Sequence, residues 1–455
     1  MNIVIVGLGK VGETLAHQLA QDGNDIYAID LDAKKIEDIS NNEDHIMGFV
    51  GNGAVHSVQV EANIKDADLF IAVTGSDELN ILCCIIAQKS GCRAIARVRD
   101  PEYSAETSFL KEGLDLEMII NPEYTAAREI ARILRFPSAM KIDSFADGRV
   151  ELLKFKLPEN SILENTKVME VVTKLRCDVL ICLVERTVNG VTQALIPNGN
   201  FEIQSGDVLG IIASTQNAHA FFRKINYRTG SAKDVIVAGG GSIGRYLCRE
   251  LVRDGVNVTL IEKDKRRSEE LCTIEPDITV VNADATSKDL LMQYHVGEKD
   301  GFVALTNMDE ENILLSLFAA SQGKVKTIAK INRFDFDDIV KKLDLDTIIY
   351  PKNITADVIV RYVRAMKSAM GSSMKTLYSI SRDQVEAAEF EITQESRLTD
   401  RPIQELKMRP ETLIAAVLRG RKVIIPRGPD MLKVGDSVVI VTKMKRISDI
   451  EDILG

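Results

Sequence analysis

The sequence consists of two copies of one unit, and this duplication limits the folds that the chain can adopt. Residues 3–30 read IVIVGLGKVGETLAHQLAQDGNDIYAID, and residues 235–262 read VIVAGGGSIGRYLCRELVRDGVNVTLIE, at an offset of 232. The same offset carries the segment 74–80, TGSDELN, onto 306–312, TNMDEEN. An offset that stays constant over so long a stretch indicates a repeated structural unit. Any fold that is assigned to one copy therefore has to suit the other.

A smaller repeated part follows each large part. Residues 197–207, PNGNFEIQSGD, match residues 426–436, PRGPDMLKVGD, at an offset of 229. The length of 455 residues alone favours about three domains of roughly 150 residues each, whereas the duplication favours four. The predicted parts are 1–139, 140–225, a polar linker at 226–232, 233–372 and 373–455.

Each large part alternates apolar, β-branched strands with amphipathic helices. Near-continuous apolar strands that are separated by helices are typical of a parallel sheet covered on both faces. Six such strand–helix units form a complete doubly wound, Rossmann-like domain. In the first copy we expect strands at 2–6, 25–30, 46–50, 69–74, 93–98 and 118–121.

Each small part has a different pattern, which predicts a compact α+β lobe. In the first copy we expect a strand at 150–157, a short helix at 166–175, and a hairpin formed by 178–186 and 191–196. The Asn-Gly pair at 189–190 suits a two-residue type I′ turn, because both central positions of that turn need positive φ. The predicted fold class is therefore α/β, with two Rossmann-like parallel sheets, each followed by a small α+β lobe.

A glycine-rich loop follows the first strand of each large part. In the pattern Gly7-x-Gly9-x-x-Gly12, the first glycine permits a tight turn and the second lets a pyrophosphate approach the backbone, while the third lets the next helix pack closely. The N-terminus of that helix offers free N–H groups to a phosphate. The predicted loop residues are Gly7, Leu8, Gly9, Lys10, Val11 and Gly12 in the first copy, and Gly239, Gly240, Gly241, Ser242, Ile243 and Gly244 in the second.

Polar residues follow the second and third strands of each copy. Asp30 and Glu262 end the second strand, where a carboxylate accepts hydrogen bonds from a ribose diol and repels a 2′-phosphate. Asn52 and Asp284 follow the third strand, where a side chain can meet the edge of an adenine. The sequence therefore predicts that NAD or an adenosine nucleotide binds, rather than NADP.

Further candidates lie at the ends of the fourth and fifth strands. Thr74 with Gly75, and Thr306 in the second copy, open a loop above the expected pyrophosphate. Arg97 and Lys330 end the fifth strand, where a cation can reach a terminal phosphate or a nicotinamide-side group. A surface ion pair is the alternative for Arg97.

Composition excludes several classes of function. Lys and Arg number 57 against 67 Asp and Glu, and the formal net charge of −10 argues against a protein that tracks nucleic-acid phosphates. The chain has no run of about 18 apolar residues and no signal-peptide pattern, so we expect no membrane span. The seven cysteines include no C-x-x-C pair, which favours buried, reduced thiols in a reducing compartment.

The sequence offers no catalytic residues. A dehydrogenase needs an acid or a base near the nicotinamide, and the small parts carry no His or Lys in a shared frame. The acidic pairs at 77–78 and 309–310 precede a helix, so we favour an interaction with the helix dipole over metal binding. Two nucleotide clefts without catalytic machinery favour a nucleotide sensor, and an NAD-dependent oxidoreductase is the alternative.

Several segments together resemble tandem RCK (KTN) proteins, the family that includes the TrkA subunits of Trk potassium-uptake systems. These segments are the two glycine loops with Asp30 and Glu262, the stretches IAVTGSDELN and VALTNMDEEN, and the Gly-Asp-containing small parts. The resemblance covers essentially the whole chain. It implies a non-enzymatic, cytoplasmic regulatory subunit, peripheral on the inner face of the cell membrane, that gates a TrkH-like potassium-translocating subunit.

The resemblance also implies ligands and an assembly. Its N-lobes would bind NAD(H) or the adenine nucleotides ATP, ADP and AMP, and four chains would form a ring of eight RCK units. Apolar helices at 122–134 and 351–366 would cross to a partner N-lobe, and packing within their own domain is the alternative. A sensor of the same kind that serves a different transport partner remains an alternative.

Two departures from the family pattern indicate that the two sites differ in ligand preference. Family members commonly have Gly-Asp-Ala after the third strand, whereas this chain has GNG at 51–53 and ADA at 283–285. Arg97 corresponds to Lys330, and an ammonium does not replace a bidentate guanidinium.

Overall fold

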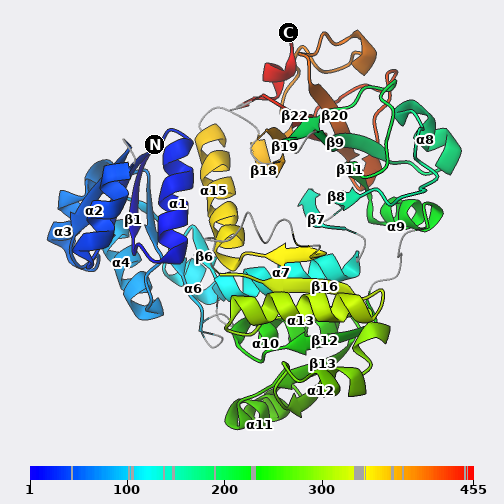
Figure 1. Cartoon of the computed structure of the whole chain (residues 1–455). Coiled ribbons are helices and arrows are strands. Elements are labelled where there is room, and N and C mark those ends of the chain that lie inside the picture. The colour runs from blue at the N-terminus through cyan, green and yellow to red at the C-terminus, as the bar shows by residue number, and fades with distance from the viewer. Residues whose placement is uncertain are drawn as a thin grey trace. The chain divides into compact units, whose positions relative to one another are not determined.

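The computed structural model contains two parallel and two antiparallel sheets (Figure 1). The chain divides into two compact units, Met1–Ala131 with Asp234–Val360, and Arg132–Lys233 with Arg361–Gly455. Each unit therefore combines corresponding parts of the two copies. The described residues are 1–42, 45–100, 103, 107–136, 139–145, 149–188, 191–226, 232–332, 343, 345–369, 374–381, 384–444, 447 and 449–455.

The first large lobe is a six-stranded parallel sheet with helices between its strands. The strands are β1 (Asn2–Val6), β2 (Asp25–Asp30), β3 (Ile46–Val50), β4 (Leu69–Ala72), β5 (Arg93–Arg97) and β6 (Met118–Ile120). The helices are α1 (Lys10–Gln21), α2 (Ala33–Asn42), α3 (His56–Glu61), α4 (Asp77–Lys89), α6 (Thr107–Gly113) and α7 (Pro122–Arg135). The order β3-β2-β1-β4-β5-β6 reverses direction between β1 and β4, which places a crevice at the carboxyl ends of these strands.

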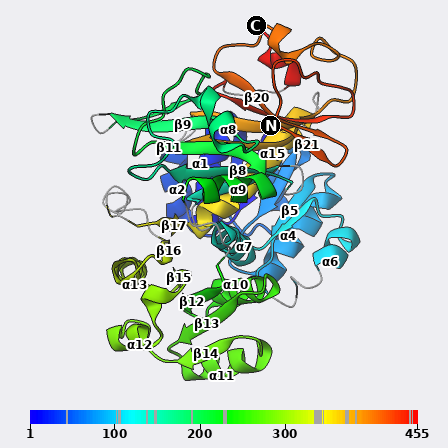
Figure 2. The ribbon, with the colours of Figure 1, turned by 90° about the vertical axis from the view of Figure 1, so that its right-hand side faces the viewer.

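The second large lobe repeats this architecture. Its strands are β12 (Asp234–Ala238), β13 (Asn257–Glu262), β14 (Thr279–Asn282), β15 (Gly301–Ala304), β16 (Lys326–Lys330) and β17 (Thr347–Ile349). Its helices are α10 (Ser242–Arg253), α11 (Lys265–Ile274), α12 (Lys288–Gln293), α13 (Asp309–Gln322) and α15 (Pro351–Ala369). The strand order β14-β13-β12-β15-β16-β17 is that of the first lobe (Figure 2). The predicted pair of Rossmann-like sheets is confirmed.

The central strands are apolar throughout, as a sheet with helices on both faces requires. Every residue of β4 and of β15 is buried. Phe70 and Ala87 belong to one buried cluster, and their counterparts Phe302 and Ala319 belong to the matching cluster of the second lobe. Strand and helix thus bury equivalent side chains in the two copies.

The first small lobe is a five-stranded antiparallel sheet with two helices. The strands are β7 (Lys141–Phe145), β8 (Val150–Lys156), β9 (Leu180–Val188), β10 (Val191–Leu195) and β11 (Val208–Ser214), and the helices are α8 (Val168–Leu175) and α9 (Thr215–Lys224). The predicted strand, helix and hairpin strands are all present in the order β10-β9-β11-β8-β7. The prediction missed β7, β11 and α9, and its turn at 189–190 lies outside the described residues.

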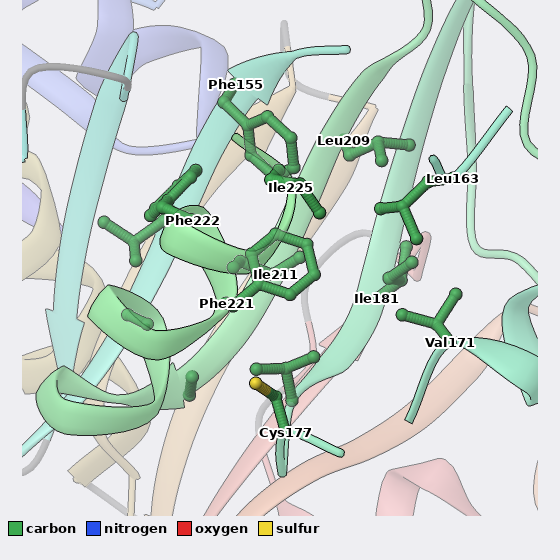
Figure 3. Packing of buried hydrophobic residues seen from close by; sticks show 14 of the residues in the cluster. Phe155, Leu163, Val171, Cys177, Ile181, Leu209, Ile211, Phe221, Phe222 and Ile225 are labelled. Atoms are coloured by element: carbon green, nitrogen blue, oxygen red, sulfur yellow. The ribbon is translucent and has the colours of Figure 1, made fainter. Parts of the chain in front are cut away.

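Aromatic packing buries one face of α9, a helix that also has an N-cap at Ser214. Phe155 of β8 lies with its ring centroid 5.8 Å from that of Phe221 and 5.0 Å from that of Phe222 (Figure 3). All three side chains are buried, with Ala218 on the same side of the helix. Burial of one helix face stabilises a short helix more than intrinsic propensity does.

The second small lobe has a corresponding antiparallel sheet. Its strands are β18 (Met374–Ser381), β19 (Val385–Glu391), β20 (Thr412–Arg419), β21 (Lys422–Ile424) and β22 (Ser437–Thr442). They pair in the order β18-β19-β22-β20-β21. The fold class predicted for the chain, a parallel sheet followed by a small lobe in each copy, is confirmed.

The repeated Gly-Asp motif of the small lobes holds the turn before the last strand. Asp207 accepts hydrogen bonds from Nε and Nη2 of Arg186 at 2.8 and 2.7 Å, and Asp436 accepts the same two from Arg419 at 2.8 Å each. Both aspartates are buried. A bidentate pair of this kind fixes geometry, so the motif has a structural role in both copies.

Two expectations from composition can be compared with the structure. Six of the cysteines are buried, as predicted, and burial raises the pKa of the Cys182 thiol to about 12. Cys272 is exposed, contrary to the prediction, because Ser268 and Leu271 form the buried side of α11. Within the described ranges, no helix has the length and apolarity that crossing a membrane requires.

Candidate nucleotide-binding clefts

The glycine loop of the first copy lies between β1 and α1. Gly7 has a φ of +96°, and a β-carbon on it would lie 2.9 Å from Cα of Thr74. A β-carbon on Gly12 would lie 1.9 Å from the carbonyl oxygen of Gly7. On Gly9, by contrast, a β-carbon would meet no atom within 4 Å. The fold of the loop therefore requires the first and third glycines and leaves the second one open.

The glycine loop of the second copy has the same geometry. Gly239 has a φ of +111°, and a β-carbon on it would lie 2.8 Å from the carbonyl oxygen of Leu305. A β-carbon on Gly244 would lie 2.2 Å from the carbonyl oxygen of Gly239, whereas one on Gly241 would meet nothing within 4 Å. An open second glycine is what a loop needs if a pyrophosphate is to approach its backbone.

The other predicted loop residues have different environments. Lys10 and Ser242 are exposed and begin α1 and α10. Leu8, Val11 and Gly240 are buried, and Ile243 is half-buried. Gly240 faces the protein, because a β-carbon there would lie 2.5 Å from Cδ1 of Leu271.

The acid at the end of the second strand holds each glycine loop in place. Asp30 accepts hydrogen bonds from the amides of Leu8 (2.6 Å) and Asp32 (2.9 Å). Glu262 accepts them from the amides of Gly240 and Asp264, at 2.7 Å each. A carboxylate offers about four acceptor positions, so each acid has capacity left for the hydroxyls of a ribose.

A buried asparagine organises the loop after the fourth strand. In the first copy, Oδ1 of Asn80 accepts from the amide (2.8 Å) and the hydroxyl (2.7 Å) of Thr74, and its Nδ2 donates to the carbonyl of Arg97 (2.9 Å). Asn312 makes the same bonds to Thr306 and Lys330. Because Thr74 binds Asn80, β4 ends at Ala72 rather than at the predicted residue 74.

Sequence reasoning did not assign these two asparagines a role. Asn80 and Asn312 are fully buried and occupy equivalent positions of the two copies. The repeat was the only signal that could have identified them. Next to this network, Gly75 accepts a hydrogen bond from Nη2 of Arg99 at its carbonyl oxygen, 2.6 Å away, and a β-carbon on it would meet no atom within 4 Å.

The cations that end the fifth strands differ between the copies. Nη1 of Arg97 donates to the carbonyl of Thr74 at 3.4 Å, and its Nη2 lies 4.0 Å from Oε1 of Glu123. Burial, and then the neighbouring Arg99, lower the pKa of the Arg97 guanidinium. Lys330 donates to the carbonyl of Leu305 at 3.2 Å, and burial lowers the pKa of its ammonium. The ion pair that we considered for Arg97 is present, but it is long and half-buried.

The residues that follow the third strands also differ. Oδ1 of Asn52 accepts from the amide of Ala54 at 2.9 Å. Oδ1 of Asp284 accepts from the amide (3.0 Å) and the hydroxyl (2.7 Å) of Thr286, while its Oδ2 lies 2.6 Å from Nζ of Lys263. These hydrogen bonds, first that of Lys263, lower the pKa of Asp284 to about 2.

A cavity of about 1070 Å³ brings the second-copy residues together. It is lined by most of the predicted second-site residues, including Gly241, Glu262, Asp284 and Thr306. Gly240 is not among the lining residues, in agreement with its contact with Leu271. The predicted residues that line this cavity are Gly239, Gly241, Ser242, Ile243, Gly244, Glu262, Asp284, Thr306 and Lys330.

The same cavity is also lined by residues of the first copy. Lys10, Pro122 and Glu123 face it, although sequence reasoning placed Lys10 only in the first site. The start of α7 reaches the second copy because Asn121 donates to the hydroxyl of Tyr246 at 3.1 Å, and the rings of Tyr124 and Tyr246 lie 5.5 Å apart. The start of this helix thus contacts the second large lobe of the same chain.

The aspartates that begin α4 and α13 tie these helices to the end of the fifth strand. Oδ2 of Asp77 accepts from the amides of Arg99 and Asp100 at 2.8 Å each, and Asp309 accepts from the amide of Asn332 at 3.0 Å. Among the side chains that the structure describes, no group of three or more His, Cys, Asp or Glu residues could hold a metal ion. The contacts of both aspartates are structural ones.

The fold and the two glycine loops define a class of protein, a tandem of two Rossmann-type lobes that each carry a dinucleotide-type glycine loop and precede an antiparallel lobe. A model of the TrkA-N domain matches residues 3–122 and 235–351, and a model of the TrkA-C domain matches residues 152–226 and 387–455. The chain belongs to the TrkA family.

Named relatives match the chain over its full length. It is 31% identical over 469 residues to the Trk system potassium uptake protein TrkA homolog 1 of Methanosarcina mazei, with 99% of each chain covered. It is 29% identical to the TrkA homolog of Archaeoglobus fulgidus, with 100% of each covered, and 28% identical to TrkA of Haemophilus influenzae, with 99% and 98% covered. These values confirm the tandem resemblance that the motifs indicated.

Solved structures of the GsuK channel have the same fold. The chain superposes on the GsuK channel with a TM-score of 0.64 at 18% identity, covering 98% of this chain and 77% of that one. It superposes on the GsuK channel bound to NAD with a TM-score of 0.63 at 17% identity and the same coverage. At such identities the likeness shows the fold alone.

Proposed function

We propose that the chain is a nucleotide-sensing regulatory subunit of a potassium-uptake system. It acts on a TrkH-like, membrane-embedded potassium-translocating subunit and is peripheral on the cytoplasmic face of the membrane. The relatives that are named Trk system potassium uptake proteins support the link to potassium. The GsuK channel bound to NAD supports a nucleotide as the ligand of this fold.

One observation carries the proposal for nucleotide binding. A β-carbon has no room at Gly7, Gly12, Gly239 or Gly244, whereas Gly9 and Gly241 could each accept one without contact. The protein itself therefore gives no reason for a glycine at 9 or 241. A ligand phosphate that approaches the backbone there supplies the reason. The ligands are NAD(H), ATP, ADP or AMP, with the ribose on Asp30 or Glu262.

The cavity of the second copy is lined by residues of both copies, and this suggests how ligand binding becomes a conformational signal. A ligand held by the Gly241 loop would also meet Lys10 and Glu123 of the first copy. It would then bind best when the two large lobes have one particular arrangement. A ligand shifts a conformational equilibrium only by its differential affinity for the two states, a coupling of roughly 1–3 kcal/mol in typical cases.

The proposal extends to the assembly and the absence of chemistry. Four chains form a ring of eight units, and the large and small parts have the boundaries that the repeat predicts, at 139, 225, 232 and 372. The chain binds nucleotides without turning them over, and a duplicated NAD-dependent oxidoreductase is the competing reading.

Binding and transport measurements test this function together. Calorimetry with NADH and ATP should give saturable binding to the full chain, and the chain should co-purify with a multi-span potassium subunit. In cells that lack the chain, the native protein should restore potassium uptake that responds to nucleotides. A variant with both Gly9→Val and Gly241→Val should not restore this nucleotide control. Oxidation of NADH with a small substrate, or uptake that the double variant regulates normally, would contradict the proposal.

A further inference from the structure

We propose that the two nucleotide clefts are coupled, so that a ligand in one cleft strengthens binding in the other, and that the hydroxyl of Tyr246 carries this coupling. The inference rests on the proposed nucleotide-binding function and goes beyond it, because two clefts can each bind a nucleotide without affecting one another. Both clefts belong to the compact unit formed by Met1–Ala131 and Asp234–Val360.

Tyr246 joins the second copy to the strand ends of the first. Its side chain is buried on α10, and its hydroxyl donates to the carbonyl of Arg99 at 3.3 Å. The same hydroxyl accepts a hydrogen bond from Nδ2 of Asn121 at 3.1 Å. Nδ2 of Asn121 also donates to the carbonyl of Arg99, at 3.2 Å, so the three groups form a closed set of hydrogen bonds. A hydroxyl has a single proton to donate, and that of Tyr246 is used by the first copy.

On the first-copy side, this contact leads to the loop above the first cleft. Nη2 of Arg99 donates to the carbonyl of Gly75 at 2.6 Å, and the amide of Arg99 donates to Oδ2 of Asp77 at 2.8 Å. Gly75 is exposed, and a β-carbon on it would meet no atom within 4 Å. The loop that would lie over a pyrophosphate in the first cleft is therefore bonded to Arg99 through two of its residues.

On the second-copy side, the contact leads to the glycine loop. The helix α10 begins at Ser242, directly after the open Gly241, and Tyr246 lies about one turn further along. A phosphate on the Gly241 loop would bind the free N–H groups of the first helical turn. It would thereby hold the part of α10 that carries Tyr246.

The next turn of α10 is also fixed to the first copy. The ring of Tyr124 lies edge-on to that of Tyr246, with 5.5 Å between the centroids. The hydroxyl of Tyr124 donates to Oε1 of Glu250, a buried carboxylate, at 3.4 Å. Close-packed contacts of this kind transmit small displacements, so a shift of α10 changes the position of α7 and of the segment at Arg99.

The first copy shows that the fold does not need a tyrosine at this place. The position on α1 that corresponds to Tyr246 is Thr14, whose hydroxyl donates to the carbonyl of Lys10 in its own helix at 2.9 Å. The core side of the two helices is the same, with Leu15 and Leu247 both buried at the next position. Tyr246 therefore serves the contact between the copies rather than the helix itself.

The direction of the coupling follows from the order that each ligand imposes. A ligand that restricts one loop pays conformational entropy, and a second ligand that depends on the same bonded path then pays less, which gives positive cooperativity. Coupling between binding sites is reciprocal, so either ligand can bind first. The weight of one hydrogen bond and the low end of typical couplings both correspond to about fivefold in affinity.

Calorimetry measures the coupling as a ratio, with ATP and NADH as the probes. The Gly241→Val chain gives the association constant of the first cleft while the second is empty, and the Gly9→Val chain gives that of the second while the first is empty. The native chain gives the overall constant for filling both. We expect this overall constant to exceed the product of the two single-cleft constants by about fivefold.

A substitution then assigns the coupling to the hydroxyl. Tyr246→Phe keeps the ring and removes only the hydroxyl. It should lower the ratio to below about twofold and leave both single-cleft constants unchanged. Tyr27→Phe is the matched control, because the hydroxyl of Tyr27 also accepts from an asparagine, Nδ2 of Asn63 at 3.2 Å, but within the first copy. The control should keep the native ratio.

Amide hydrogen exchange follows the path itself. In the Gly9→Val chain, a nucleotide in the second cleft should slow exchange at the amides of Arg99 and Asp100, which both bind Oδ2 of Asp77, although the first cleft is blocked. Adding Tyr246→Phe should abolish this slowing, whereas Tyr27→Phe should not.

The outcomes separate this inference from the proposed function. A ratio at or below one in the native chain, a ratio or a slowing of exchange that survives Tyr246→Phe, or binding at one cleft only would overturn the coupling and leave nucleotide binding standing. Failure of both ATP and NADH to bind the native chain would instead overturn the proposed function.

Discussion

The two large lobes share the groups that hold the glycine loop and the strand ends, which we call the frame. They differ in the residues after the third strand and at the end of the fifth strand, which we call the rim. Their glycine loops, their acid clamps at Asp30 and Glu262, and their buried asparagines repeat bond for bond. At the rim, Asn52 of the first copy corresponds to Asp284 of the second, and Arg97 corresponds to Lys330. The frame is built from glycines and from side chains that bond to backbone groups, which tolerate little change, whereas the rim is built from side chains that differ between the copies. Divergence at the rim alone can give the clefts different ligands.

The largest expected effect separates the two clefts from each other. Gly9→Val should weaken nucleotide binding at the first cleft by at least about 100-fold, because a branched side chain would occupy the space of the pyrophosphate. Gly241→Val should do the same at the second cleft only. Thermal unfolding should hardly change, because neither β-carbon meets an atom within 4 Å. Gly113→Val, at another open glycine, is the control.

The second effect tests whether the frames are equally rigid. Gly12→Ala and Gly244→Ala place a β-carbon 1.9 and 2.2 Å from a carbonyl oxygen, so backbone has to move. Each should lower the free energy of unfolding by roughly 1–3 kcal/mol, the usual cost of overpacking. Urea denaturation measures it. A neutral result in either copy would mean that this loop is not packed as described.

The third effect concerns the acids. Asp30→Ala should weaken binding at the first cleft by about tenfold, because it removes a ribose acceptor and frees the amide of Leu8. Glu262→Ala should act on the second cleft in the same way. Calorimetry in the Gly241→Val chain measures the first cleft, and in the Gly9→Val chain the second. If either acid substitution weakened binding equally at both clefts, the two clefts would not be separate sites.

The smallest effect is a pH dependence that only the second rim should show. The folded pKa of Asp284 is lowered to about 2 from an unfolded value near 3.9, so its pairing with Lys263 stabilises the fold fully above about pH 4. That stabilisation is lost as the pH falls toward 2. The difference in unfolding free energy between the native chain and Lys263→Met should shrink over this range, whereas Leu31→Met should show no such trend.

Much of the fold could be predicted from the sequence because the large lobes have strong local patterns. All six strands of the first lobe were placed correctly, and β4 alone was clearly too long, since the bond between Thr74 and Asn80 ends it early. The small lobes were harder. The helix α9 was missed although it carries local signals, an N-cap at Ser214 and an apolar face with Phe221 and Phe222, which the prediction did not use.

The sequence by itself determined the duplication, the parallel sheets, the glycine loops and the acids of both clefts. These features depend on local spacing and on the backbone conformations that glycine allows. Tertiary structure alone decided that Asn80 and Asn312 organise the strand ends, that Asp284 is saturated on one oxygen, and that Lys10 and Glu123 line the cavity of the other copy. Each of these depends on which side chains distant in the chain come within bonding distance, and residue spacing along one copy carries no record of that.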